Sequence, residues 1–326
     1  DTDNINDDTV GGDIGRSGDY DDDDDQQFVV GRDNLALLCW RSDPSDSLSD
    51  WTLQIFNRTT KEFCTYHIHR VVLGVGPRAC GYFQDVFQQQ QQQQPPNNNY
   101  NNSAASLQNK VTRVPLIARA CQFVPALLDY CYRNPQFDVT RQNAVALCYL
   151  ADFFKNFPLW RLAADFIEMD LSTNRESIHH YYTEAVYYDQ NDFLFLVFAT
   201  CSVHLPGMAC DYEKEVEEEE SRRREIHPGR SDERQLDGCN YERLLDELSP
   251  HHFSQILVEI ESLSETESDL ASMTNMVALF CYLHRGELSL EAFDHFVSRI
   301  TVMGTSSALL FLETSLDYDW TSPTGM

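Results

Sequence analysis

The sequence predicts an α+β N-terminal domain, built as a small sheet capped by helices, followed by an all-α region of helical hairpins. Two observations predict the sheet. Apolar and polar residues alternate at 51–55, and short strand-like runs follow at 62–67 and 111–116. A third observation predicts the rest: beyond 116, apolar residues recur as far as 316 with the period of amphipathic helices.

The bulk composition favours a globular protein that binds neither nucleic acid nor membranes. The chain has 326 residues, 42% of them hydrophobic, which is enough for two or three domains with real cores. Its net charge of −28 repels phosphate groups, whose binding requires clustered Lys and Arg. The strongest apolar run, Phe193–Cys201, is far shorter than the roughly 20 residues of a membrane span.

Cysteine usage and the N-terminal residues indicate the compartment. Ten cysteines are scattered along the chain without a CxxC pair, which is typical of buried free thiols in a reducing compartment. The first 25 residues are acidic and lack the apolar stretch of a secretory signal. We therefore expect an intracellular protein, in the cytoplasm, the nucleus or both.

The chain opens with a segment that cannot build a core. Residues 1–27 are rich in Asp, Gly and Asn and end in five consecutive aspartates, so we expect a disordered acidic tail. Residues 28–47 carry scattered apolar residues and fit either an extra strand or a short helix.

The predicted domain then begins with a β-hairpin. Polar residues at 57–60 form a turn between the runs at 51–55 and 62–67, and the apolar side of the first run faces the core. Two short helices are expected at 69–73 and 82–87. The Gln- and Asn-rich segment 88–109 has nothing to pack with, so we expect a low-complexity insert that loops into solvent.

The remainder alternates between helices and polar links. A second, strongly charged insert at 211–236 fits either a solvated loop or a helix extension. Ser249-Pro250 is a good helix start, because Ser caps and Pro suits the first helical position. Leu309, Leu310 and Leu312 are expected to supply the last apolar face. Helices are expected at 121–132, 143–154, 159–169, 175–187, 192–205, from 250 onward, and at 266–284, 288–301 and 304–316.

Sequence patterns of catalytic and metal sites are missing. There is no Gly-rich phosphate loop, no nucleophile elbow and no HExxH motif. The histidine pairs have no Cys or carboxylate at metal-ligand spacing beside them. We therefore expect no enzymatic activity, no cofactor and no metal. These pairs are His67/His69, His179/His180 and His251/His252.

Five segments in chain order resemble the BTB/POZ domain. They are an Asp-initiated strand, a His-Arg-Val-Val-Leu helix, a Tyr-Phe-Gln-Asp-Val-Phe helix, a Leu-Leu-Asp-Tyr-Cys-Tyr helix and a Leu-Cys-Tyr-Leu-Ala-Asp helix. The match covers about Asp50–Leu171, and we assign 28–171 to a BTB/POZ-like domain. The helical region 172–326 looks like a BACK-type extension. The segments lie at 50–55, 69–73, 82–87, 127–132 and 147–152.

The resemblance implies homodimerisation. Asp50 and Arg70 match the family's charged pair at the dimer interface, and His69 lies beside them. If such a pair is buried, removing one partner is costly because the other charge is left unpaired. The alternative is that Asp50 only caps the strand, that Arg70 is exposed and that His69 is a structural histidine.

The resemblance also implies a second surface, for a cullin scaffold, around 116–132 and the following helices. Its candidate residues are Leu116, Phe123, Leu127, Tyr130 and Tyr132. Many ligase adaptors of the family carry an acidic residue just before this helix, and 117–122 has none. The expected function is a dimeric adaptor that holds an unknown protein client for a cullin-based ubiquitin ligase. The alternative is a dimerisation scaffold without a ligase role.

Overall fold

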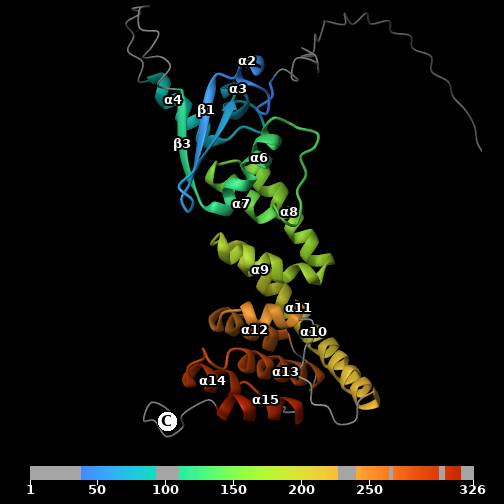
Figure 1. Ribbon diagram of the computed structural model, residues 1–326. Helices are drawn as coiled ribbons and strands as arrows, with labels where there is room; N and C mark the ends of the chain where they lie inside the picture. Colours follow the sequence, from blue (N-terminus) through green and yellow to red (C-terminus); the bar gives the residue numbers. More distant parts are fainter. Residues whose placement is uncertain (1–37, 93–109, 227–239, 264–266, 301–304, 317–326) are drawn as a thin grey trace, which may run out of the picture.

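The computed structural model of the chain describes residues 38–92, 110–226, 240–263, 267–300 and 305–316. A small sheet with its covering helices lies at one end, and helices follow in layers towards the other end (Figure 1). The predicted α+β portion followed by an all-helical region is confirmed at this level. The acidic tail 1–27 lies outside the described residues, and the transitional segment contributes one short helix, α2 (Pro44–Ser47).

The sheet has three strands in the order β2-β1-β3. β1 pairs antiparallel with β2 and parallel with β3, so the sheet is mixed. The predicted alternation of β1 is confirmed, because Trp51, Leu53 and Ile55 are all buried. The strands are β1 (Trp51–Asn57), β2 (Phe63–Ile68) and β3 (Val111–Leu116).

Helices cover one face of the sheet, and two of them differ from the prediction. α4 continues to Gln92, so the first glutamines of the insert are helical rather than looped out. Glutamine is a good helix former, and the buried Phe87 anchors the preceding turn. Residues 93–109 lie outside the described part. α6 begins at Ala118, three residues before the predicted start at 121. The helices are α3 (Arg70–Gly74), α4 (Gly81–Gln92), α6 (Ala118–Cys131), α7 (Ala144–Phe153) and α8 (Phe157–Thr173).

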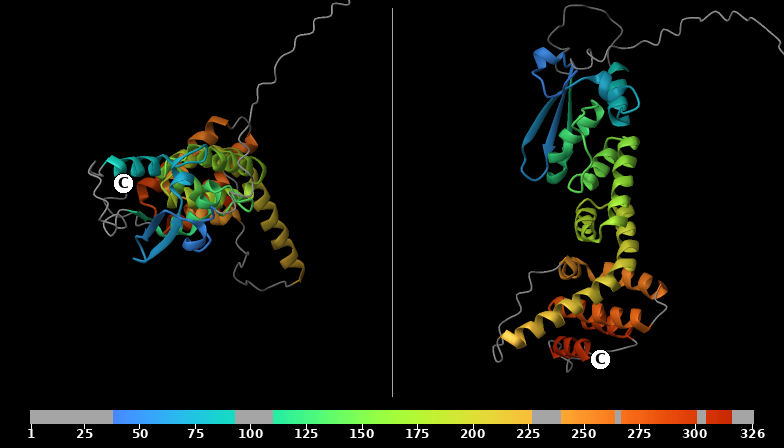
Figure 2. Two further views of the ribbon diagram at one scale, coloured as in Figure 1. Left: turned by 90° about the horizontal axis from the view of Figure 1, so that it is seen from above. Right: turned by 90° about the vertical axis from the view of Figure 1, so that its right-hand side faces the viewer.

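The helical region is built from stacked helices around the long helix α10. This helix does not end at 205 but continues to Ile226, past Pro206, and its end projects from the body (Figure 2). For 211–226, the helix-extension alternative is therefore the observed one. The elements are η1 (Arg175–Ser177), α9 (Ile178–Tyr187), α10 (Asn191–Ile226), α11 (Asn240–Glu247), α12 (Pro250–Leu263), α13 (Glu267–Leu283), α14 (Leu290–Val297) and α15 (Thr305–Leu316).

The predicted apolar face of the last helix is wrong for two of its three leucines, since only Leu310 packs against the core. Leu309 and Leu312 are exposed, whereas Ser307, Phe311 and Thr314 are buried. The side of α15 that packs on α13 is thus partly polar, and Ser307 donates a hydrogen bond to Asn275 of α13. Small side chains let the two helices approach closely, which a count of apolar residues does not reveal.

Buried side chains form one continuous cluster from Trp51 to Phe311. The expected boundary at 171/172 falls within the last turns of α8. One stretch, Asn191–Val216 within α10, is long and apolar enough to cross a membrane. Half of its most apolar window is buried inside the structure, and core helices pass the same test, so the finding is weak evidence.

Candidate protein-interaction surfaces

Asp50 and Arg70 form the pair that the sequence predicted. The Arg70 backbone N–H donates to Asp50 Oδ1 at 2.9 Å, and Arg70 Nε donates to Oδ2 at 2.8 Å. One carboxylate therefore ties the start of α3 to the entry of β1. The two side chains keep 38% and 39% of their surface exposed, so the pair lies at the surface of the single chain.

The surroundings of the pair keep Asp50 charged. Burial raises the pKa of Asp50, but the hydrogen bonds from the Arg70 N–H and guanidinium, together with the guanidinium charge, outweigh this effect. The net pKa of Asp50 is lower than its ordinary value. The Arg70 guanidinium also lies 5.4 Å from the centroid of the Trp51 ring, which fixes its position over the start of β1.

His69 is buried beside the ion pair's segment and hydrogen-bonds to neighbouring elements. It is 3% exposed. Its backbone N–H donates to the Tyr132 hydroxyl at 2.7 Å, its Nδ1 lies 2.9 Å from the same hydroxyl, and its Nε2 lies 2.5 Å from the Ser47 carbonyl oxygen. A ring protonated at Nε2 satisfies every contact, with the hydroxyl donating to Nδ1. The structural alternative for His69 is therefore the one that this geometry favours.

Exposed apolar side chains lie close to the ion pair in the chain. Leu48, Val71 and Val75 are 71%, 57% and 67% exposed. The bond from His69 to Ser47 holds Leu48 near the start of α3, and Val71 and Val75 are four positions apart at its two ends. We call Leu48, Asp50, Arg70, Val71 and Val75 the α2–α3 face. Apolar residues around a neutralised ion pair are the composition of a surface that gains free energy when it is covered.

Tyr132→Phe is expected to lower the free energy of unfolding by about 1–3 kcal/mol. The substitution removes the hydroxyl that accepts from the His69 backbone N–H, and a buried donor without a partner costs about that much. Urea denaturation followed by circular dichroism measures it. Tyr66→Phe is the control, because within the described residues the half-buried Tyr66 hydroxyl makes no hydrogen bond. Equal effects of the two substitutions would contradict this account of Tyr132.

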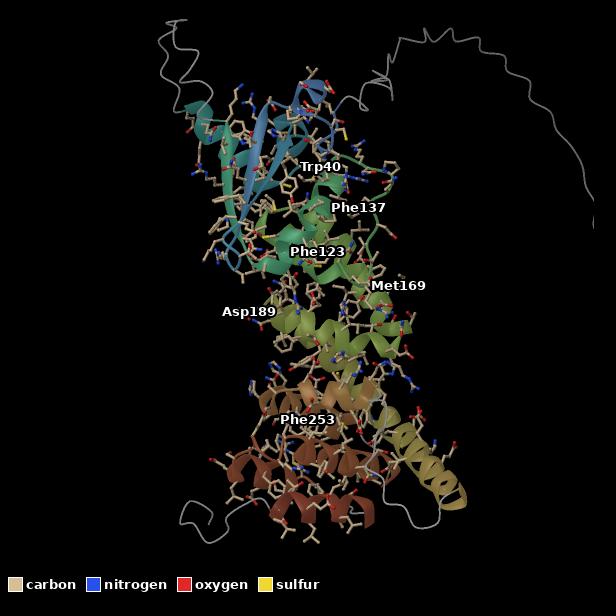
Figure 3. The ribbon with its side chains drawn as sticks, viewed as in Figure 1. Trp40, Phe123, Phe137, Met169, Asp189 and Phe253 are labelled. Carbon is tan, nitrogen blue, oxygen red and sulfur yellow. The ribbon has the colours of Figure 1, made fainter. Side chains whose placement is uncertain are left out.

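Most of the residues predicted for a cullin surface are in the core. Leu116, Leu127 and Tyr130 are buried, so they do not form a surface of the single chain. Phe123 and Tyr132 are half-buried, and Figure 3 shows Phe123 among the helices beside the sheet. The reason is geometric: β3 and α6 turn these side chains towards the shared core.

The helix that follows them does expose apolar side chains. On α8, Phe157, Leu162 and Met169 are exposed, and Figure 3 shows Met169 near the end of that helix. Phe157 stacks on Trp160, with ring centroids 6.2 Å apart. This set, which we call the α8 face, is the part of the predicted second surface that reaches solvent; Leu162 and Met169 share one side of the helix, and Phe157, in its first turn, lies about 120–140° around the axis from them.

A buried carboxylate anchors the first described residues, and the sequence did not reveal it. Asp129 accepts from Trp40 Nε1 at 3.0 Å, from Arg41 Nη2 at 2.6 Å and from Asn134 Nδ2 at 2.9 Å. Asp129 is 8% exposed, and Trp40 lies beside α6 in Figure 3. The sequence did contain one signal for this contact: Asp129 lies on the apolar side of α6. Acidic side chains are buried only when they are paired, so a partner for Asp129 could have been expected.

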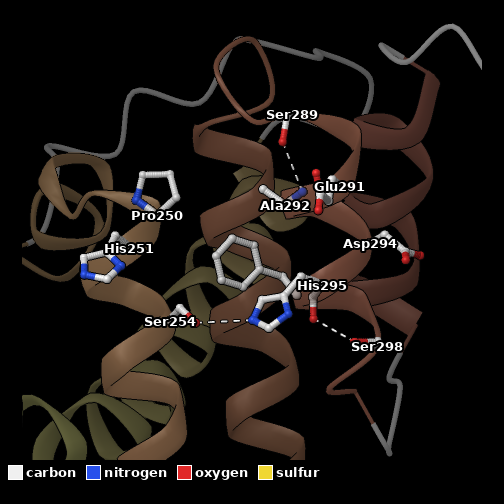
Figure 4. A pocket seen from close by; sticks show the side chains of 10 residues that line it. Pro250, His251, Ser254, Ser289, Glu291, Ala292, Asp294, His295 and Ser298 are labelled. Atoms are coloured by element: carbon white, nitrogen blue, oxygen red, sulfur yellow. Dashed lines mark hydrogen bonds between the residues drawn. The ribbon is translucent and has the colours of Figure 1, made fainter. Parts of the chain in front are cut away.

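A shallow groove of about 560 Å³ lies between α12 and α14 (Figure 4). Ser254 Oγ lies 3.3 Å from His295 Nε2, which resembles the first contact of a nucleophile and its base. Within the described residues, however, His295 makes no ion pair with a carboxylate that would orient its ring. The described part of the chain also holds no group of three His, Cys, Asp or Glu side chains placed to bind a metal ion.

Comparison with known proteins gives no match. No family model, no curated protein and no solved structure matches this chain. The resemblance in the sequence therefore stays a prediction, and functional inference depends on the surfaces described above.

Proposed function

We propose that the chain is a homodimeric protein-interaction adaptor of the BTB/POZ type with a BACK-like helical region. The observation that carries the proposal is the partly exposed Asp50–Arg70 pair, with exposed apolar residues close to it in the chain. It occurs where the sequence resemblance placed a dimer contact. No catalytic activity, cofactor or metal is part of the proposal.

Electrostatics favours a second copy of the chain as the occupant of the α2–α3 face. A twofold dimer brings the same patch of each subunit together, so a patch with net charge repels itself. The chain carries a net charge of −28, yet Asp50 and Arg70 neutralise each other within this face. The pair itself therefore adds little like-charge repulsion between two copies, and the acids next to it, Asp43 and Asp46 at α2, are exposed.

The proposed partner of the dimer is the cullin scaffold of a ubiquitin ligase. Support comes from the α8 face, because the resemblance extends the second surface to the helices after α6. The helical region is the proposed site for a protein client. Free thiols throughout the described part support an intracellular location, in the cytoplasm, the nucleus or both.

The alternative, a dimerisation scaffold without a ligase role, has a specific observation in its favour. Three of the five predicted cullin-contacting side chains are buried: Leu116, Leu127 and Tyr130. The segment 117–122 also lacks the acidic residue that many ligase adaptors carry.

Calorimetric titration of the full chain with the N-terminal part of the host's cullin separates the two roles. The ligase role predicts a saturable isotherm with one cullin per protomer, and Phe157→Ala is expected to weaken binding at least about tenfold. Val258→Ala on α12 is the matched control, because Val258 is an exposed apolar residue outside the α8 face. A folded sample that gives no heat at tens of micromolar rules out the ligase role and leaves the scaffold.

A further inference from the structure

Two buried thiols contact each other where the link between α3 and α4 meets the end of α6. The Sγ atoms of Cys80 and Cys131 are 3.8 Å apart, although the residues are 51 positions apart in the chain. Both side chains are buried. Among the cysteines that the structure describes, these are the two whose sulfur atoms touch.

A polar side chain contacts both thiols of this pair, whereas the buried Cys121 and Cys148 hydrogen-bond to backbone carbonyl oxygens. Asn156 Nδ2 lies 3.5 Å from Cys80 Sγ and 3.8 Å from Cys131 Sγ. The same amide donates to the Arg78 carbonyl oxygen at 3.0 Å, and the Arg78 guanidinium donates to the Tyr130 carbonyl oxygen, also at 3.0 Å. The Asn156 amide therefore lies close to both sulfur atoms, and the Arg78 cation is bound to the backbone next to Cys131.

These contacts divide the pair into two unequal thiols. The hydrogen bond from Cys131 is the main influence that lowers the pKa of Cys80, and Asn156 adds to it against the effect of burial. The pKa of Cys131 is raised, first by its hydrogen bond to Cys80 and then by burial. Burial alone raises the pKa of the isolated Cys281 to about 12.

We propose that Cys80 and Cys131 form an oxidation site at which a peroxide drives formation of a disulfide, with Cys80 as the attacking thiol and Cys131 as the resolving thiol. The Cys80 thiolate attacks one peroxide oxygen, a sulfur–oxygen bond forms, and the oxygen–oxygen bond breaks. With hydrogen peroxide, the leaving oxygen departs as water with the thiol proton, and Cys80 becomes a sulfenic acid. The Cys131 thiolate then attacks the Cys80 sulfur, and the hydroxyl leaves with the Cys131 proton as a second water. Two electrons pass from the thiols to the peroxide.

The disulfide would join the end of α6 covalently to the segment between α3 and α4. Closing it brings the sulfur atoms from 3.8 Å to about 2.05 Å, which requires a small movement of both side chains. The Cys80 backbone N–H donates to the Leu73 carbonyl oxygen of α3 at 2.8 Å, so the link cannot move far from that helix. The disulfide therefore restrains the segment next to α3, which is part of the α2–α3 face. Its formation does not depend on dimerisation.

The test treats the full chain with hydrogen peroxide, blocks the remaining thiols with an alkylating reagent and maps peptides by mass spectrometry without reduction. The expected result is a Cys80–Cys131 cross-linked peptide that dithiothreitol removes. Cys64 is exposed and reports that oxidant was present. Cys148→Ser, at a buried cysteine outside the pair, is expected to leave the cross-link unchanged.

A second variant tests the assigned roles. Cys131→Ser is expected to stop the reaction at the Cys80 sulfenic acid, which dimedone traps as a stable adduct. Recovery of Cys80 and Cys131 as alkylated thiols in the wild-type chain, while Cys64 is oxidised, would overturn the proposal. Cross-links spread evenly over all cysteines would also overturn it, because that pattern arises from an unfolded chain.

Discussion

Asp50→Ala is expected to raise the dissociation constant of the dimer at least about 100-fold. In the proposed dimer the α2–α3 face is covered, so the substitution leaves the Arg70 guanidinium buried without its partner, at a cost of about 3–5 kcal/mol. In the single chain the pair is partly solvated, so the free energy of unfolding falls by only about 1–2 kcal/mol. Sedimentation velocity over a concentration series measures the dissociation constant.

Two variants control this experiment. Asp165→Ala removes the acid of an exposed pair with Arg161 on α8, at 4.0 Å, and is expected to leave the dimer unchanged. The double variant with Asp50→Arg and Arg70→Asp reverses the pair and is expected to recover part of the lost affinity. An Asp50→Ala chain that dimerises as tightly as the wild type would show that the ion pair does not lie in a dimer interface.

Protonation of Asp50 at low pH is expected to weaken the dimer as Asp50→Ala does. The folded-state pKa of Asp50 is lowered, so the stabilisation from this group is fully present above its unfolded pKa of about 3.9. It is lost as the pH falls through the lower, folded-state value. Dimer affinity should therefore change little between pH 7 and pH 5 on account of this group, and a loss within that range would have to come from another one.

Leu127→Ala is expected to lower the free energy of unfolding by about 2–5 kcal/mol. The side chain is 1% exposed and packs in the shared core, so its removal leaves a cavity that the neighbouring residues fill only partly. Chemical denaturation measures the loss. This result separates two placements of Leu127. The sequence resemblance placed it on a partner-binding surface, where its truncation would change the free energy of unfolding very little.

Gln122→Ala on the same helix is the matched control. Gln122 is exposed, and its truncation is expected to change the free energy of unfolding by no more than about 0.5 kcal/mol. If Leu127→Ala were as stable as Gln122→Ala and instead lost affinity for a partner, the buried placement of Leu127 would be wrong.

Local patterns predicted the strands and most helices, because they follow from the period of the backbone. The alternation of Trp51, Leu53 and Ile55 can bury only one side of β1, and the structure buries that side. Helix lengths were less accurate. Nothing apolar marks where α4 or α10 ends, and polar residues with good helix propensity extend both.

The same patterns could not separate a surface from a core. An apolar stripe on a helix packs in the same way against its own sheet or against a partner, so Leu127 and Tyr130 could be placed on either side. α15 shows the converse, since Leu309 and Leu312 are exposed while Ser307 is buried. The choice depends on which helices the fold brings together.

Long-range polar contacts were partly predictable. The Asp50–Arg70 pair was expected because the sequence around these residues resembles a family pattern. Arg41 and Asp129 are 88 positions apart, and no local period connects them. The Cys80–Cys131 contact depends in the same way on the fold, which brings two distant turns together.

Light scattering of the full chain across a concentration series tests the central claim, that this chain is a homodimer, most directly. The account predicts a mass of twice the 37.5 kDa of one chain in the micromolar range, falling towards one chain on dilution. Asp50→Ala should shift that transition to higher concentration. A mass of 37.5 kDa at every concentration, from a folded sample, would contradict the dimeric adaptor and leave the α2–α3 face without its proposed occupant.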